Sequence, residues 1–144
     1  NEDVWSARGS FLEAIKASTS LMDECDVVVP RSEVSDYIKY TYELEEKYGL
    51  RLPSFGHAGD GNLHIYICKD NLSDEEWEVK LDMVFHDLYN KAKEVGGLVS
   101  GEHGIGYAKM EYLKESLGDV QINLMRNIKA AFDPKNLLNP GKIV

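Results

Sequence analysis

Apolar residues recur every three or four positions along much of the chain, a spacing that is typical of one buried helix face. The pattern predicts helices over residues of about 4–14, 32–48, 74–95, 105–116 and 119–132. In the last of these helices, the stripe that we expect to be buried consists of Ile122, Met125, Ile128 and Phe132.

Several helix ends carry signals of their own. Ser32 is the expected N-cap of the second helix, and Gly49 supplies a left-handed residue that stops it. Ser73 and Glu76 have the three-residue spacing of a capping box at the start of the third helix. Asp133 precedes a proline, so we expect the last helix to end there.

Two stretches have the pattern of strands instead. The sequence CDVVVP (25–30) places three valines before a proline, which predicts a short buried strand. The sequence SFGHAGDGNLHIYI (54–67) alternates on both sides of Asp60-Gly61, a pair typical of a hairpin turn. A further short strand is expected at LVS (98–100), directly before a glycine-rich segment.

The hairpin turn predicts that two histidines face each other. If Asp60 and Gly61 form the turn, residues whose numbers sum to 121 are paired, and His57 lies opposite His64; a four-residue loop over 59–62 keeps this pairing. Directly opposed Cβ atoms are roughly 4.5 to 5.5 Å apart, close enough for two imidazoles to bind one metal ion.

Alternation along the same hairpin predicts two different faces. One face is apolar and suited to packing under helices: Ala58, Leu63, Ile65 and Ile67. The other face is polar and aromatic: Phe55, His57, Asn62, His64 and Tyr66. The second face is the expected site, although two histidines on a half-exposed sheet can also be without function.

A third ligand is available in SGEHGIG (100–106), where glycines flank Glu102 and His103. Glu102 could complete a site of two histidines and one carboxylate, a ligand set that suits Zn²⁺, Mn²⁺ or Fe²⁺. His103 would then face a substrate and act as general base near neutral pH. The alternative is an ordinary glycine-rich turn before a helix.

Composition narrows the class of protein. The 144 residues, 43% of them apolar, fit one compact domain. The net charge of −9 and the absence of a Lys and Arg cluster argue against nucleic acid as a partner. No apolar run approaches the roughly 20 residues of a membrane span, and no signal peptide is recognisable, so we expect a cytoplasmic or peripherally membrane-associated location. Cys25 and Cys68 lack CxxC spacing and are expected to be buried.

Five motifs together carry a resemblance to a known family: WSAR (5–8), DVVVP (26–30), GHAGDGNLH (56–64), SGEHGIG (100–106) and FDPKNLLNPGK (132–142). They resemble the C-terminal domain of the FAD-linked oxidases, which include glycolate oxidase, D-lactate dehydrogenase and D-2-hydroxyglutarate dehydrogenase. The motifs occur in order and cover essentially the whole chain.

The resemblance implies an architecture. Residues 1–144 would form an α+β substrate (cap) domain, with a ferredoxin-like antiparallel sheet covered by helices. FAD would be bound mainly by an N-terminal domain that is absent from this chain, in keeping with a sequence that starts at Asn1 and looks like part of a longer protein. An iron-sulfur protein or an electron-transfer flavoprotein is a further partner that the family suggests.

The resemblance also implies roles for individual residues. His57, His64 and Glu102 resemble the ligands of a divalent metal, commonly zinc. His103 resembles the base that removes the hydroxyl proton as hydride passes to the flavin. The implied reaction is oxidation of a 2-hydroxy acid to a 2-oxo acid.

Four more residues are expected to bind substrate or cofactor. Arg8 resembles the group that binds the substrate carboxylate, for which a guanidinium has a matching geometry. Lys109 is a second candidate for the same carboxylate. Asn139 and Lys142 are expected to reach the flavin.

Two departures bear on the substrate. The 2-hydroxyglutarate enzymes carry Asn where this chain has Tyr66, and a lysine close to the segment that reads MDECD (22–26) here. These differences favour a small monocarboxylate, glycolate or D-lactate, over a dicarboxylate.

Two other function classes remain open from the residues alone. A metallohydrolase could use the same two histidines and glutamate with a bound water, although no HExxH motif is present. A non-catalytic ferredoxin-like binding module would need the histidines only as structural residues.

Overall fold

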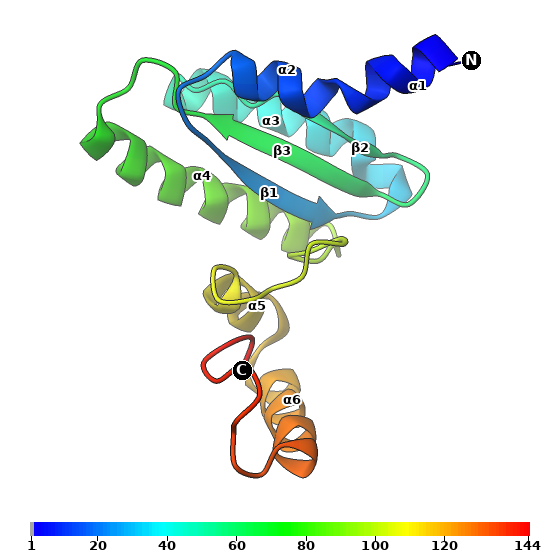
Figure 1. The fold of residues 1–144 in the computed structure, drawn as a ribbon, viewed down its shortest axis with the longest axis vertical. Helices are drawn as coiled ribbons and strands as arrows, with labels where there is room; N and C mark the ends of the chain where they lie inside the picture. Colours follow the sequence, from blue (N-terminus) through cyan, green and yellow to red (C-terminus); the bar gives the residue numbers. More distant parts are fainter. Residues whose placement is uncertain (1) are drawn as a thin grey trace.

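The computed structural model describes the backbone of residues 2–144, and the side chains of residues 5–7 and 9–144. Two short helices precede the first strand, and the remaining elements follow in the order shown in Figure 1. They are α1 (Glu2–Gly9), α2 (Phe11–Ala17), β1 (Met22–Val28), the 3-10 turn η1 (Arg31–Glu33), α3 (Val34–Tyr48), β2 (Ser54–His57), β3 (Asn62–Cys68), α4 (Asp74–Glu94), α5 (Met110–Leu117) and α6 (Asp119–Phe132).

Within residues 2–144 the sheet has three antiparallel strands in the order β1-β3-β2. The chain order strand, helix, strand, strand, helix matches most of a ferredoxin-like unit. At the outer edge of β1, Leu98 forms an isolated bridge with Val28, where the fourth strand of such a unit would pair. The α+β fold with an antiparallel sheet is therefore confirmed, and the strand expected at 98–100 is reduced to this bridge.

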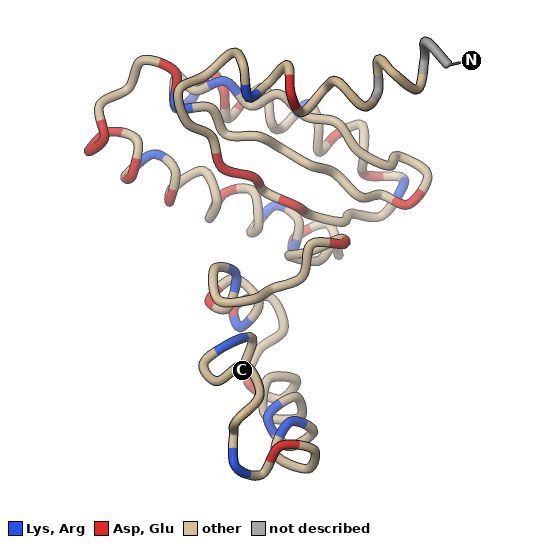
Figure 2. Tube along the Cα trace, in the orientation of Figure 1, with Lys and Arg blue, Asp and Glu red and all other residues tan. Residues whose placement is uncertain are grey.

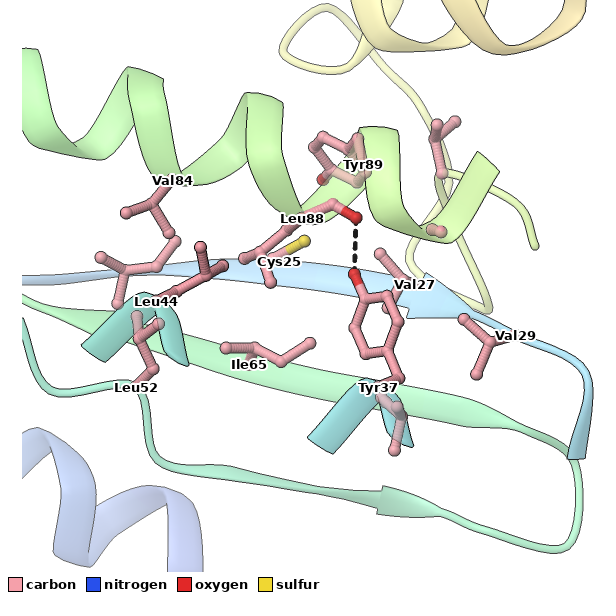
Figure 3. Close-up of a cluster of buried hydrophobic side chains, with 14 of the residues drawn as sticks. Cys25, Val27, Val29, Tyr37, Leu44, Leu52, Ile65, Val84, Leu88 and Tyr89 are labelled. Carbon is pink, nitrogen blue, oxygen red and sulfur yellow. Dashed lines mark hydrogen bonds between the residues drawn. The ribbon is translucent and has the colours of Figure 1, made fainter. Parts of the chain in front are cut away.

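The hydrophobic core lies between one face of the sheet and the helices α3 and α4 (Figure 3). Cys25 and Val27 of β1 and Ile65 of β3 are fully buried there. Tyr37 of α3 is also buried, and its hydroxyl donates a hydrogen bond of 2.6 Å to the carbonyl oxygen of Leu88 in α4. This bond joins the two helices across the core.

Replacing Tyr37 by phenylalanine should lower the free energy of unfolding by about 0.5–1.5 kcal/mol, because the ring remains and only the hydrogen bond is lost. Urea denaturation followed by circular dichroism measures the change. Tyr42→Phe is the matched control, since Tyr42 lies on the same helix with 58% of its surface exposed. Equal stability of the two variants would contradict the assigned role of the Tyr37 hydroxyl.

The expected helix ends are confirmed in part. Ser73 and Glu76 form the predicted capping box, and Gly49 ends α3 with a φ of 62°. The expected N-cap at Ser32 is wrong, because η1 precedes α3 and the Ser32 hydroxyl contacts Glu33. The first predicted helix is divided at Ser10 into α1 and α2, in keeping with the low helix propensity of a Gly-Ser pair.

The prediction of a buried stripe on α6 is confirmed only in part, because Met125 is partly buried against the core but two of the four residues are exposed. Ile122 is buried, but Ile128 is 52% exposed and Phe132 is 86% exposed. The physical reason is visible in Figure 1, where α5, α6 and the C-terminal segment extend away from the sheet. The second half of this apolar face therefore meets solvent in this chain. None of the described helices is long and apolar enough to cross a membrane.

The segment after α6 folds back on the helix. Asp133 accepts hydrogen bonds from the Lys129 ammonium and from the backbone N–H groups of Leu138 and Leu137, which together lower the pKa of Asp133 to about 2. Further on, the backbone N–H of Ile143 donates to the carbonyl oxygen of Gly106. This bond joins the C-terminal segment to the last residue of the glycine-rich motif.

Candidate metal centre

The hairpin between β2 and β3 turns one residue earlier than predicted. Its four-residue loop spans 58–61, so His57 pairs with Asn62, and Phe55 pairs with His64. The predicted direct opposition of His57 and His64 is therefore wrong by two positions. The side-chain faces are unchanged, because only an odd shift moves a residue to the other face. Ala58, expected in the core, lies in the turn and is exposed.

Contacts with Val29, the residue that follows β1, fix the position of the turn. The backbone N–H of Val29 donates to the carbonyl oxygen of Gly61, and a Cβ added at Gly61 would lie 2.0 Å from the carbonyl oxygen of Val29. Gly61 also has a φ of 78°, which a side chain would disfavour. The close approach of two distant segments thus sets the register.

The three predicted metal ligands meet on the face of the sheet opposite α3 and α4. Glu102 Oε1 lies 3.0 Å from His64 Nε2 and 3.7 Å from His57 Nε2. Ligands bound tetrahedrally to zinc are about 3.4 Å apart, given metal bonds near 2.1 Å. The donor types and their separation fit one divalent ion with a position left for another ligand.

A second carboxylate, Glu24 of β1, belongs to the same cluster and was missed by the sequence reasoning. Its Oε1 lies 2.8 Å from His64 Nδ1 and 3.3 Å from His103 Nδ1. A carboxylate at Nδ1 fixes the proton there and directs Nε2 of His64 toward Glu102. Glu24 pairs with Tyr66 across β1 and β3, and burial together with the nearby Glu24 charge raises the pKa of Tyr66.

His103 lies directly beside the ligand cluster. Its ring stacks on that of His64, with 4.8 Å between centroids and 29° between planes. Because Nδ1 of His103 faces Glu24, Nε2 is its basic nitrogen. The predicted general base is thus adjacent to the predicted metal ligands and, with 45% of its side chain exposed, open to a substrate.

Comparison with known proteins decides the family. The model of the family described as "FAD linked oxidases, C-terminal domain" matches residues 1–143. This chain belongs to that family. A D-lactate dehydrogenase of Anaerostipes hadrus is 51% identical over 142 residues, which is 99% of this chain and 30% of the relative.

Other relatives of this FAD-linked oxidase domain have different names. The glycolate oxidase subunit GlcD of Bacillus subtilis is 42% identical over 134 residues, covering 93% of this chain and 28% of the relative. A D-2-hydroxyglutarate dehydrogenase of Stutzerimonas stutzeri is 33% identical over 148 residues, covering 99% of this chain and 31% of the relative. The chain therefore spans about a third of the length of these relatives.

The space around the cluster in this FAD-linked oxidase domain is open on one side and aromatic on the other. A hollow of about 350 Å³ is lined by Val28, His57, Asp60, Asn62, Gly101 and Glu102. On the aromatic side, the ring of Phe55 stacks on that of Tyr66, with 5.3 Å between the ring centroids. The centroid of the Phe11 ring, from α2, lies 6.1 Å from that of Phe55. A small ligand could enter the hollow and reach the two predicted metal ligands that line it, His57 and Glu102.

Beneath the cluster lies Asp26 of β1, a second residue that the sequence reasoning missed. It is completely buried, and burial alone would raise the pKa of its carboxyl. Hydrogen bonds from the His103 backbone, Asn62, Ser100 and the Glu102 backbone outweigh this effect and hold the pKa of Asp26 well below its usual range. The carboxylate is therefore charged at neutral pH, and Figure 2 shows the acidic positions along β1 to which it belongs.

Three other predicted residues lie outside the ligand cluster. Lys109 directs its ammonium to within 3.6 Å of Asp26 Oδ2, and only 14% of its side chain is exposed. Asn139 and Lys142 line a separate, mostly apolar hollow of about 500 Å³ beside α6. The side chain of Arg8 lies outside the described residues. The predicted roles of these four residues stay predictions.

Proposed function

We propose that this chain is the substrate and metal domain of an FAD-dependent dehydrogenase or oxidase, which converts a 2-hydroxy acid to a 2-oxo acid. One observation carries the proposal: in a member of the FAD-linked oxidase family, the ligand atoms of His57, His64 and Glu102 converge beside His103. A metal-binding set next to a base suits the removal of a hydroxyl proton.

The roles of the side chains follow from their positions. His57, His64 and Glu102 would hold the divalent ion, most suitably zinc, which when bound polarises the hydroxyl of the substrate. His103 would accept the hydroxyl proton at Nε2 while Glu24 holds the proton on Nδ1. Arg8 is proposed to bind the substrate carboxylate. The hydride would pass to FAD.

The FAD-binding domain of the parent protein is the proposed partner. The relatives are about three times as long as this chain. The exposed apolar residues of α6 and the following segment would lie against that domain: Val120, Leu124, Ile128, Phe132, Leu137 and Leu138. Asn139 and Lys142 are next to this surface, which supports their proposed contact with the flavin.

A small monocarboxylate is the proposed substrate class. Tyr66 is buried on the face of the sheet that carries the site, and its ring stacks on that of Phe55. A tyrosine has no side-chain amide that could bind a second substrate carboxylate, unlike the asparagine of the 2-hydroxyglutarate enzymes. Glu24 and Glu102 add negative charge close to the histidines. A second substrate carboxylate would be repelled by these groups. Glycolate and D-lactate are the substrates that fit.

The test is steady-state oxidation of three hydroxy acids by the full-length protein loaded with FAD, with an artificial electron acceptor. We expect kcat/KM for D-lactate or glycolate to exceed that for D-2-hydroxyglutarate by about tenfold or more, the effect of one unfavourable charge contact. Preference for the dicarboxylate would contradict the substrate class. Ester hydrolysis without flavin would contradict the reaction and favour a metallohydrolase.

A further inference from the structure

Asp26 is a charged side chain with no exposed surface, in a strand of otherwise apolar buried neighbours. Burying a carboxylate is costly unless hydrogen bonds replace its water. Here the replacement donors come mainly from one short segment, 74 to 77 positions later in the chain. Asp26 therefore links β1 to the segment that carries two of the proposed functional residues.

The geometry of this link is specific. Asp26 Oδ2 accepts hydrogen bonds from three consecutive backbone N–H groups, of Gly101 at 3.1 Å, Glu102 at 3.2 Å and His103 at 2.9 Å. The Ser100 hydroxyl donates to the same oxygen at 2.9 Å. Consecutive N–H groups that converge on one anion form a nest, which fixes the orientation of the peptide planes. The directions of the Glu102 and His103 side chains follow from those planes.

The other carboxylate oxygen of Asp26 is hydrogen-bonded to a side chain of β3. Asp26 Oδ1 accepts a hydrogen bond of 2.8 Å from the Asn62 side-chain amide, two residues before His64. One carboxylate thus contacts both the strand that carries His64 and the segment that carries Glu102. Both oxygens are used, so a side chain with a single acceptor oxygen could accept hydrogen bonds from only one of the two segments.

Gly101 permits this close packing. A Cβ added there would lie 1.6 Å from the Asn62 amide nitrogen and 2.9 Å from Asp26 Oδ1, with both side chains buried. Any larger residue at position 101 must displace the segment or Asn62. Gly59 in the hairpin turn is different, since an added Cβ meets nothing within 4 Å.

We infer that Asp26 is the positioning residue of the metal centre: through the backbone of 101–103 it holds Glu102 within reach of His57 and His64, and His103 against Glu24. The inference rests on the proposed function for the identity of the site. Asp26 itself touches neither substrate nor metal. Its substitution should therefore weaken metal binding without removing any ligand.

The test uses the full-length protein with Asp26→Asn, and the zinc dissociation constant is measured by competition with a chelator. We expect zinc to bind about 10- to 100-fold more weakly, the usual effect of losing an outer partner of a metal ligand. Amide hydrogen exchange at residues 101–103 should become faster, while exchange in the core strand β3 stays slow. The Co²⁺-substituted protein should show an altered visible spectrum.

Two further variants separate positioning from a general loss of structure. Gly101→Ala keeps the carboxylate but displaces the segment, and we expect the same loss of zinc affinity, whereas Gly59→Ala should bind zinc as the wild type does. The exchange variant Asp26→Asn with Asn62→Asp restores a carboxylate-amide pair between the strands. It should recover thermal stability but not zinc affinity, because the carboxylate no longer faces the N–H groups.

The outcomes distinguish this inference from the proposed function. Wild-type zinc affinity in both Asp26→Asn and Gly101→Ala would overturn the inference and leave the proposed function intact. Full recovery of affinity in the exchange variant would also overturn it. If the wild type binds no metal and oxidises no hydroxy acid, the proposed function fails; faster exchange at 101–103 in Asp26→Asn still supports Asp26 as the anchor of that segment.

Discussion

Changing His57 and His64 together to alanine should remove the metal from the full-length protein. Two imidazole ligands are lost and only the Glu102 carboxylate remains, which cannot retain zinc by itself. Elemental analysis for zinc, manganese and iron measures the metal content, which we expect to fall from about one ion per chain to less than about 0.1. The double variant therefore tests the ligand set directly.

The one histidine outside the predicted site, His86, provides the control. His86 lies on α4, and the acidic groups near it, on Asp82 and Glu115, are 3.8 Å and 3.9 Å away. His86→Ala should keep its metal. An unchanged metal content in the double variant would refute the proposed ligand set. Absence of metal from both the variant and the wild type would favour the non-catalytic binding module.

The second large effect is expected from His103→Ala in the FAD-loaded protein. Loss of the general base should reduce kcat for the best hydroxy acid by about 10²- to 10⁴-fold. The metal should be retained, because His103 is not one of the three proposed ligands. Turnover and metal content are measured on the same preparation, so that loss of the base can be distinguished from loss of the centre.

Two comparisons make the result for His103 decisive. His86→Ala should keep wild-type turnover, which controls for removal of an imidazole elsewhere on the domain. Unchanged turnover in His103→Ala would show that His103 is not the general base. A rate loss accompanied by metal loss would instead assign His103 to the metal centre, next to Glu24 and His64.

Alternation along the hairpin was sufficient to place His57 and His64 on one face, and the prediction of that face is confirmed. The register could not be obtained in the same way, because it depends on how Gly61 packs against Val29. That contact joins segments 32 positions apart, whereas turn propensities describe only neighbouring residues. A two-residue error in pairing left the metal-ligand prediction unaffected because it preserves the side-chain face.

Glu24 and Asp26 were missed although the sequence contains a signal for them. Both lie in MDECDVV, where Glu24 and Asp26 alternate with Cys25 and Val27, which are buried against the helices. Aspartate is depleted in strands, so its occurrence before three valines was unusual. The second face of this strand, followed in the same way as that of the hairpin, would have directed both carboxylates toward the histidines.

The apolar stripe of α6 shows a different limit. Periodicity predicts which residues of a helix share a face, and Ile122, Met125, Ile128 and Phe132 do so. It does not say which part of the molecule covers that face. In this chain the helix extends beyond the sheet, and Ile128 and Phe132, half of the stripe, are exposed.

The distance along the chain between Asp26 and its partners has a consequence for folding. The hairpin can close early, because His57 and His64 are only seven positions apart. The Asp26 contacts close loops of more than 70 residues, and such long-range contacts form slowly. We therefore expect the proposed three-ligand centre to form after the sheet and its covering helices have assembled. If the proposed ion binds, we expect its tight binding by a refolding chain to mark the end of folding.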